Sequence, residues 1–501
     1  MVRQGVLRPT DLTHAEDYCS DVGAAFFDGV AWQDFTLTCE FMIPKGSTGA
    51  GGPSVFFRCT APNDYTVVHF INYWNNTSLM RARPGEFETE LAHHIGAPLK
   101  LDTWHRLRID AAGERVGVTL DGGTLVVADD APRAGIIGLG ARIREVRYRN
   151  VQVQGAVTRA RTEWAGKRLR RRHLVVCEDS GNGGYEAFPG LVRLKNGDLV
   201  AVFYSGWTHV SRPGGSDRPN GGRICMARSS DEGRTWGKPV VIGDTPFDDR
   251  DPSVWQAKDG SVHCAWPAAD WTAYRGSKKK DAWCHAFRVR STDNAHTWSG
   301  PQEWQIGKTL DWTVWTAPRL LSDGSWLMPV YKNCTYTSAA VIRSLDDGTS
   351  WSPPSLLDAG NKQTDEPDIV ELPGRRLLCI MRPTGRLYAW RSQSDDLGKT
   401  WTRPEPLDWH AHAPNLLLTS RGILLCAHRD PGTSVHYSFD HGKTWDGTVM
   451  IDSCGGGYPC MTELADGRVL IVYYTEGRRS DIRGQFLDVT RKGVRPGAVG
   501  S

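Results

Sequence analysis

The pattern Ser-x-Asp-x-Gly-x-x-Trp recurs along this chain and constrains its fold more than any other feature. Four copies are complete and a fifth carries Ala295 in place of the glycine; they begin at Ser229, Ser291, Ser344, Ser394 and Ser438. Successive aspartates of the pattern lie 62, 53, 50 and 44 residues apart. A repeat of roughly 40–50 residues is typical of one four-stranded blade, so the spacing predicts a β-propeller.

Each copy of the pattern is predicted to close a β-hairpin. An Asp side chain can accept hydrogen bonds from backbone amides that follow it, and Gly tolerates positive φ within a turn. The Trp ring then packs over the end of the hairpin. Alternating runs such as 339–343 and 387–391 stand before the pattern, and a period of two indicates a strand. Each of these aspartates is therefore predicted to stabilise the turn of a hairpin.

The composition agrees with an all-β chain of two or three domains. The 501 residues exceed one small domain, and 20 Trp, 54 Gly and 28 Pro fit a chain rich in turns. There is no stretch of about 18 apolar residues, and the net charge of +3 does not demand a nucleic acid or a membrane as partner. The first residues lack the apolar core of a secretory signal. We therefore expect a cytoplasmic protein, or a secreted one whose leader has been removed.

The twelve cysteines are scattered without the spacing of metal ligands. Several stand in apolar, strand-like runs, as small buried side chains do: Cys39, Cys264, Cys379 and Cys426. Cys454 and Cys460 flank three glycines and could pair, but a cytosolic chain would keep them reduced. We expect free thiols and no metal site.

The strand patterns divide the chain into two β-rich regions. The predicted parts are an N-terminal arm, a first β domain, a basic linker, the propeller and a C-terminal tail, at residues 1–23, 24–155, 156–173, 174–490 and 491–501. Five copies of the repeat mark five blades, and a sixth blade fits between Cys454 and Val489. The strand at 484–489 is expected to close the ring with material from the first blade, because closure removes exposed sheet edges.

Both regions resemble known families. The repeats resemble the Asp boxes of the sialidase superfamily and of BNR-repeat proteins, which implies a six-bladed propeller with the boxes on its rim. Residues 24–155 resemble a concanavalin-like jelly roll of the laminin-G or keto-disaccharide-hydrolase type. The residues that carry this second resemblance are Phe27-Asp28-Gly29, the strands at 34–37 and 103–109, and the closing strand at Val151. Such a domain implies either sugar binding or packing against a catalytic neighbour, and both interpretations stay open.

The first strands of a propeller converge on one mouth of its central channel, so polar residues one blade apart can share a site. The segments at equivalent places are 184–191, 248–255, 315–321, 364–372, 413–418 and 457–463. The sialidase resemblance implies Tyr458 as nucleophile and Glu366 as its base. It also implies that Arg382 and Arg429 clamp a substrate carboxylate. Glu476 would then hold one arginine in place.

The first blade departs from the sialidase pattern. Sialidases open this blade with Phe-Arg-Ile-Pro, whereas the present chain has Glu186-Ala-Phe-Pro189. Either two arginines hold the carboxylate with help from a third, or Glu186 accepts a hydroxyl or an amine of another substrate. The candidates for the third arginine are Arg212, Arg218 and Arg250. The expected general acid is Asp217, and Asp251 is the second choice. If Asp251 is not the acid, we expect it to bind the substrate.

The leading hypothesis is a retaining exo-glycosidase that releases a terminal sialic acid or related nonulosonate from a glycan, without cofactor or metal. One alternative is a carbohydrate-binding propeller that has lost catalysis together with the missing arginine. Another is a hydrolase or lyase for a different sugar, such as a uronate. In each case the expected partner is a carbohydrate.

Overall fold

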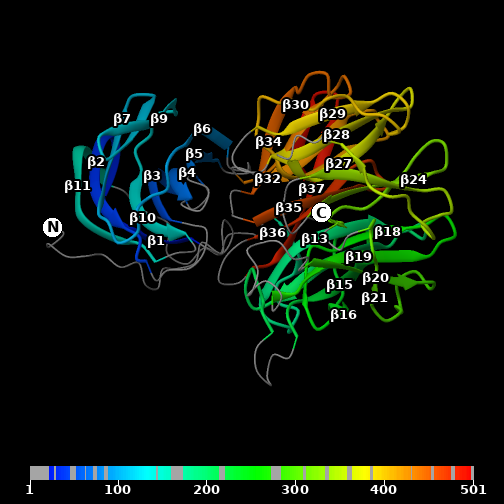
Figure 1. The fold of residues 1–501 in the computed structure, drawn as a ribbon. Coiled ribbons are helices and arrows are strands. Elements are labelled where there is room, and N and C mark those ends of the chain that lie inside the picture. Colours follow the sequence, from blue (N-terminus) through cyan, green and yellow to red (C-terminus); the bar gives the residue numbers. More distant parts are fainter. Residues whose placement is uncertain are drawn as a thin grey trace. The chain divides into compact units, whose positions relative to one another are not determined.

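A computed structural model describes residues 22–27, 30–45, 52–61, 64–71, 76–83, 89–142, 145–159, 173–213, 220–271, 284–308, 312–332, 338–357, 364–383, 388–429, 432–452, 456–475 and 480–497 (Figure 1). They fall into two compact units, one formed mainly by the chain up to Arg171 and the other mainly by the chain after it. Both are built from antiparallel β-sheets, which confirms the all-β fold. No helix in the described part is both long and apolar enough to cross a membrane.

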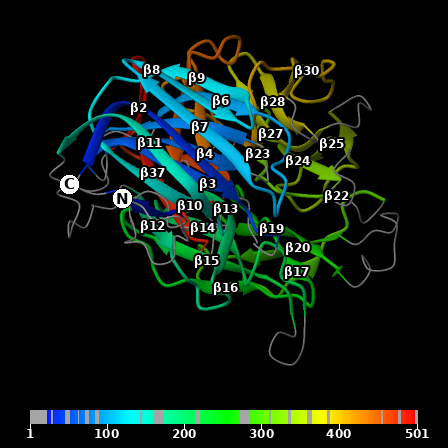
Figure 2. The ribbon, with the colours of Figure 1, turned by 90° about the vertical axis from the view of Figure 1, so that its left-hand side faces the viewer.

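The N-terminal unit is a sandwich of two sheets (Figure 2). The six-stranded sheet has the order β1 (Val22–Phe26), β10 (Ile136–Arg142), β3 (Pro53–Ala61), β4 (Asp64–Ile71), β5 (Asn76–Ala82) and β6 (Thr89–Ile95). The five-stranded sheet has the order β11 (Arg147–Arg159), β2 (Val30–Met42), β7 (His105–Ala112), β8 (Arg115–Leu120) and β9 (Gly123–Asp129). Buried and exposed side chains alternate along β7 because only one face of its sheet meets the core. This is the jelly-roll arrangement expected.

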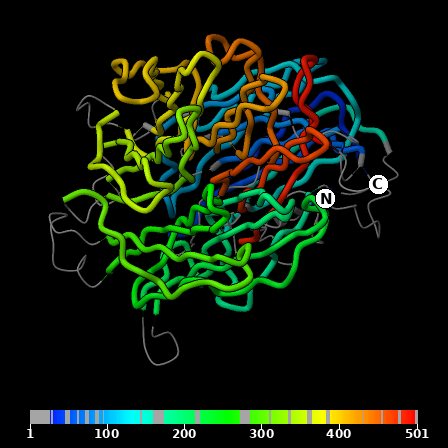
Figure 3. The backbone as a smooth tube through the Cα atoms, turned by 90° about the vertical axis from the view of Figure 1, so that its right-hand side faces the viewer, coloured from blue at the N-terminus to red at the C-terminus, as the bar shows by residue number. Residues whose placement is uncertain are grey.

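The second unit contains six sheets, each of which is one blade of a propeller (Figure 3). Blades one to three comprise β13 (Tyr185–Arg193), β14 (Leu199–Gly206), β15 (Arg223–Ser229), β16 (Val240–Gly243); β17 (Asp248–Asp249), β18 (Ser253–Gln256), β19 (Val262–Ala269), β20 (Cys284–Ser291), β21 (Gln302–Glu303); and β22 (Trp312–Thr313), β23 (Arg319–Leu320), β24 (Trp326–Lys332), β25 (Ala339–Ser344), β26 (Ser355–Leu356). Strand β14 is buried along its whole length because both faces of its blade pack on neighbouring blades.

Blades four and five comprise β27 (Thr364–Leu372), β28 (Arg376–Pro383), β29 (Trp390–Ser394), β30 (Glu405–Pro406); and β31 (His412–Leu418), β32 (Leu424–Arg429), β33 (Thr433–Ser438), β34 (Gly447–Asp452). The sixth blade closes the ring. It has the order β12 (Leu174–Cys177), β37 (Ile482–Thr490), β36 (Val469–Thr475) and β35 (Gly456–Glu463), and β38 (Gly493–Pro496) also pairs with β37. The register pairs Leu174 with Gly484, so the chain before the first blade supplies an outer strand of the last, as predicted.

The repeated pattern forms the hairpin turns that its composition predicts. In the first copy the hydroxyl of Ser229 lies 2.7 Å from Asp231 Oδ1, and that oxygen accepts the amide of Thr235 at 2.9 Å. The central glycines have φ between 80° and 86°, and Ala295 adopts 64° in their place. The contacts bridge residues two and four apart, which explains why a short motif specifies the turn. Nine cysteines lie in the described ranges and all are free thiols; Cys454 lies outside them.

Candidate active site

Five blades place a residue of unusual backbone conformation at the same point of their entry segment. Each of these residues has positive φ and stands directly before a proline: Phe188 (53°), Asp251 (42°), Glu366 (38°), Ala413 (51°) and Tyr458 (47°). In four blades the pairing of the first two strands shifts register there, which is a β-bulge, and in the second blade β17 ends and β18 begins around it. Residues before proline normally adopt extended conformations, so surrounding contacts must hold these five, as is typical of functional sites.

Three of the predicted site residues meet in one hydrogen-bonded group. The hydroxyl of Tyr458 donates to Glu366 Oε1 at 2.6 Å. Arg382 donates through Nη1 to Glu366 Oε2 at 2.8 Å and to the Tyr458 oxygen at 3.3 Å. Both oxygens of Glu366 therefore accept hydrogen bonds, and its side chain is only 3% exposed. Asp365 flanks the same arginine, with 3.7 Å between Oδ1 and Nε.

The surroundings of Tyr458 determine its protonation. Burial raises the pKa of its hydroxyl well above the ordinary value, and the Glu366 carboxylate raises it further. The charges of Arg382 and Arg429 lower that pKa. Arg429 lies over the ring, with 4.8 Å between Cζ and the ring centroid. The phenol therefore stays protonated in the free site and donates a hydrogen bond to Glu366. The charges of Arg382 and Arg429 would stabilise a phenolate.

Aromatic side chains from the first, third and sixth blades pack around the Tyr458 ring. Phe188 meets it edge to face at 5.1 Å, Trp315 at 6.1 Å, and Tyr474 at 6.1 Å in a tilted arrangement. The indole of Trp315 also donates to the backbone carbonyl of Pro367 at 3.0 Å, which joins the third blade to the bulge of the fourth. The Tyr458 ring is therefore packed among aromatic side chains, while its hydroxyl meets charged groups.

Asp251 adds a second carboxyl group to this site. Burial raises the pKa of Asp251 to about 6; the neighbouring Arg250 lowers it and the charge on Glu366 raises it. Arg250, whose Nε lies 3.7 Å from Asp251 Oδ2, lies over the ring of Phe188, and that ring packs against Tyr458. Oδ1 of Asp251 is buried and has no hydrogen-bond partner within the described residues. A carboxyl group whose raised pKa lets it hold a proton in mildly acidic solution can act as an acid.

Arg250 is occupied by its own surroundings. Its guanidinium lies 4.9 Å from the ring centroid of Phe188, 3.4 Å from Asp248 Oδ2 and 3.7 Å from Asp251 Oδ2. It also donates to the carbonyl of His209. These contacts join the entry segments of the first two blades and hold Asp251.

Other predicted residues lie apart from the group or outside the described residues. Glu186 is fully buried within the first blade, and Ser180 N donates to its Oε1 at 2.8 Å; no described contact joins it to Tyr458. Arg212 is exposed and stacks over Trp271 at 5.3 Å. Three predicted residues lie outside the described ranges: Asp217, Arg218 and Glu476. Their roles stay predictions.

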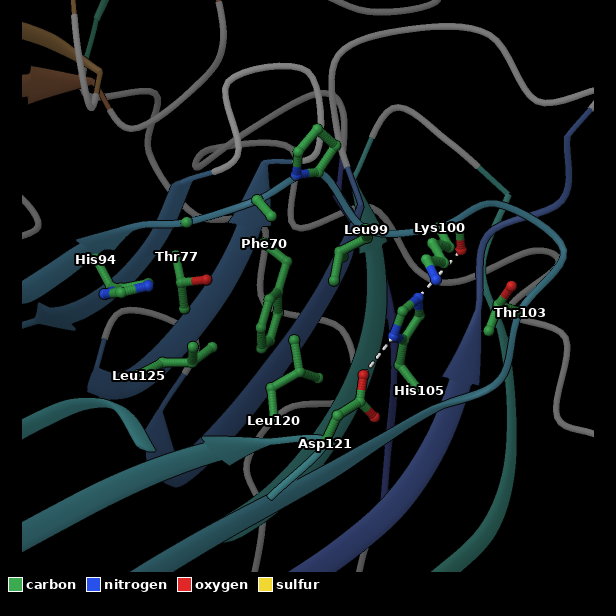
Figure 4. A pocket seen from close by; sticks show the side chains of 13 residues that line it. Phe70, Thr77, His94, Leu99, Lys100, Thr103, His105, Leu120, Asp121 and Leu125 are labelled. Atoms are coloured by element: carbon green, nitrogen blue, oxygen red, sulfur yellow. Dashed lines mark hydrogen bonds and ion pairs between the residues drawn. The ribbon is translucent and has the colours of Figure 1, made fainter. Parts of the chain in front are cut away.

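A separate pocket of about 420 Å³ lies in the N-terminal unit (Figure 4). Its labelled wall combines apolar residues, Phe70, Leu99, Leu120 and Leu125, with polar or charged ones such as Thr77, His94 and Lys100. His105 in this wall has Nδ1 2.7 Å from Asp121 Oδ2 and Nε2 3.0 Å from the Lys100 carbonyl oxygen, so both ring nitrogens are engaged. The two interpretations of the N-terminal domain stay predictions.

The described residues contain no group of three or more His, Cys, Asp or Glu side chains placed to hold a metal ion. The five residues before proline are the signal that sequence reasoning missed. The family resemblance predicted Tyr458, Glu366 and Asp251, but Phe188 and Ala413 were not predicted as site residues. An X-Pro pair at the entry of each blade would have identified them.

Comparisons with known proteins agree with this architecture. Residues 271–471 match the family model of a BNR repeat-like domain, and residues 2–154 match that of a 3-keto-alpha-glucoside-1,2-lyase-like domain. A sialidase of Bacteroides fragilis (strain YCH46) is 23% identical over 354 residues, and a sialidase of Micromonospora viridifaciens is 25% identical over 355. These matches cover 61% and 60% of this chain, which spans 63% and 52% of the two proteins.

Solved structures show the same fold. The NanB sialidase of Streptococcus pneumoniae has a TM-score of 0.52 at 11% identity, over 92% of this chain and 97% of that chain. The Hadza microbial sialidase Hz136 has a TM-score of 0.52 at 18% identity, over 92% and 94%. A protein of unknown function from Dyadobacter fermentans DSM 18053 has a TM-score of 0.54 at 23% identity, over 64% and 98%. The class of protein is a six-bladed propeller with Asp boxes. The chain resembles the sialidase superfamily and carries an N-terminal jelly-roll domain.

Proposed function

We propose that the propeller is a retaining exo-glycosidase in which Tyr458 is the nucleophile. The observation that carries this proposal is the 2.6 Å hydrogen bond from the Tyr458 hydroxyl to Glu366. A phenol is a weak nucleophile until a base takes its proton, and a base must lie within hydrogen-bond reach of that proton. Glu366 meets this requirement. A tyrosine nucleophile is also the known sialidase exception to the two-carboxylate scheme of glycosidases.

The proposed reaction has two displacement steps. In the first, the Tyr458 oxygen bonds to the anomeric carbon, its proton passes to Glu366, and the glycosidic carbon–oxygen bond breaks. The leaving oxygen takes a proton from a carboxylic acid. In the second step this carboxylate accepts a proton from water, the water oxygen bonds to the anomeric carbon, and Tyr458 leaves with the proton held by Glu366. Two inversions retain the configuration, and all groups return to their starting state.

Among the residues that the structure describes, Asp251 is the candidate for the acid, because its pKa of about 6 lets it hold a proton in mildly acidic solution. Asp217 stays a prediction for the same role. The two candidates differ in a measurable way, because the variant that lacks the true acid loses activity mainly on substrates with poor leaving groups.

The proposed substrate carries a carboxylate beside its anomeric centre, as a sialic acid or related nonulosonate does. Arg382 and Arg429 supply positive charge at the Tyr458 hydroxyl and ring, where such a carboxylate would lie. The curated relatives, both named sialidases, support this class. Ala187 stands where the sialidase pattern has the first-blade arginine, so this clamp lacks one member of the sialidase triad.

Kinetics of the wild type and of Tyr458→Phe test the proposal. The substrates are aryl glycosides of sialic acid, of a uronic acid and of neutral sugars. We expect the wild type to hydrolyse the sialoside with retention, and the variant to lose at least about 10³-fold in kcat/KM with unchanged folding. Full activity of Tyr458→Phe would rule out the nucleophile. Binding without turnover would favour a carbohydrate-binding propeller, and a 4,5-unsaturated product would show a uronate lyase.

A further inference from the structure

The strand that carries Tyr458 comes unusually close to Arg429. Gly457 has a φ of 92°, and a Cβ placed on it would lie 2.5 Å from the Cβ and 3.3 Å from the Cδ of Arg429. Side chains do not tolerate so close a contact, so only glycine permits this approach. The backbone just before the nucleophile therefore rests directly on the aliphatic part of the arginine side chain.

The guanidinium group of Arg429 contacts the residues on both sides of Gly457. Nη1 of Arg429 donates to the carbonyl of Gly456 at 3.2 Å, and Cζ lies 4.8 Å from the centroid of the Tyr458 ring. Residues 456, 457 and 458 are thus touched in succession by one side chain. Arg429 as a whole is only 7% exposed.

The turn requires such support. Tyr458 has a φ of 47° and precedes a proline, and both features are unfavourable in an unsupported chain. A cation over the face of an aromatic ring is attracted to it, and the attraction strengthens where water is excluded. Arg429 therefore holds the backbone through its stem and the ring through its charge.

We propose that Arg429 is a positioning residue for the nucleophile rather than chiefly a ligand of the substrate carboxylate. The proposal rests on the proposed function and deepens it. Arg429 keeps the Tyr458 hydroxyl within reach of Glu366 and offsets the negative charge that develops on the phenol oxygen as its proton leaves. Arg382, whose side chain is 22% exposed, is then the principal arginine for the anionic group of the substrate.

Kinetics separate the two roles of Arg429. For Arg429→Lys and Arg429→Met we expect a loss of about 100-fold in kcat and a KM within about twofold of the wild type, since a misplaced reacting group costs rate rather than binding. The loss is larger for Met, which also removes the charge. Arg391→Lys is the matched control, because Arg391 is another strand arginine that donates to a glycine carbonyl, at 3.4 Å from Gly442 O; its kinetics should be unchanged. A KM raised tenfold or more with kcat retained would overturn the proposal.

Crystal structures provide a readout that needs no turnover. In Arg429→Met, and independently in Gly457→Ala, whose new Cβ displaces the arginine stem, we expect the Tyr458 hydroxyl to leave hydrogen-bond distance of Glu366. Retention of that bond in both variants would overturn the positioning role. If the wild type hydrolyses no glycoside, the proposed function fails, and these structures still decide whether Arg429 braces the turn.

Discussion

The buried carboxyl group of Glu186 predicts a specific dependence of stability on pH. Its side chain is fully buried, one oxygen accepts the Ser180 amide, and Oε2 has no hydrogen-bond partner within the described residues. Burial raises the pKa of Glu186 to about 7, while hydrogen bonds from Ser180 and Ser205 lower it. In the unfolded chain the group ionises near its ordinary value of about 4.3. Glu186→Gln removes the titration but keeps the shape.

The sign and size of the effect follow from proton linkage. Between the two pKa values the native state binds more protons than the unfolded state, so stability falls as pH rises. The contribution is complete below the unfolded value and lost as pH passes through about 7. At about 1.4 kcal/mol per pKa unit, the loss between pH 5 and pH 8 is about 2–3 kcal/mol. The Gln variant should therefore gain about that much relative to wild type over this interval.

Denaturant titrations of both proteins at matched pH values between 5 and 8 measure this difference. A difference in unfolding free energy that stays constant with pH would refute the reasoning. The same variant tests the prediction that Glu186 accepts a substrate hydroxyl or amine. Its burial away from Tyr458 predicts an unchanged KM, and a KM raised tenfold would return Glu186 to the binding site.

Two further predictions concern the acid and the Asp boxes. Asp251→Asn should lower kcat/KM by about 10²–10⁴-fold on glycan linkages and far less on aryl glycosides with good leaving groups; equal losses would exclude Asp251 as the acid. Because the acid form of Asp251 predominates below its pKa of about 6, wild-type activity should fall as pH rises through that value, and the variant should lack this limb of the pH–rate profile. Gly398→Ala, in the fourth-blade Asp box, should lower the free energy of unfolding by about 1–2 kcal/mol in denaturant titrations, since φ is 82° and a Cβ would lie 2.7 Å from Leu327 Cδ2. It should leave kcat/KM unchanged, and unaltered stability would contradict the structural role of the box.

The elements that sequence predicts best are those whose contacts are local. The Asp boxes join residues two and four apart, such as Ser229 to Asp231 and to Gly233, so the motif itself contains the structure. Their spacing then predicts the number of blades. The closing strand followed from the same count, because an open ring would leave sheet edges exposed.

The candidate site depends on contacts that local patterns do not contain. Tyr458 and Glu366 are 92 residues apart in the chain, and Arg382 and Tyr458 are 76 apart. Family resemblance paired them, and closure of the ring brings them together. The raised pKa of Asp251 arises from burial and from the charges of groups in other blades, which no motif reveals. The close approach of Arg429 to Gly457 likewise emerges only from the packing of the fifth blade on the sixth.

The central claim is that the Tyr458 oxygen bonds to the sugar during turnover. A sialoside with a fluorine beside the anomeric carbon and an activated leaving group slows the second displacement and lets the covalent intermediate accumulate. Peptide mass spectrometry of the quenched enzyme then locates the sugar. We predict one glycosyl adduct per chain, on the peptide that contains Tyr458. An adduct on Glu366 or Asp251, or continued turnover with no adduct, would contradict the assignment.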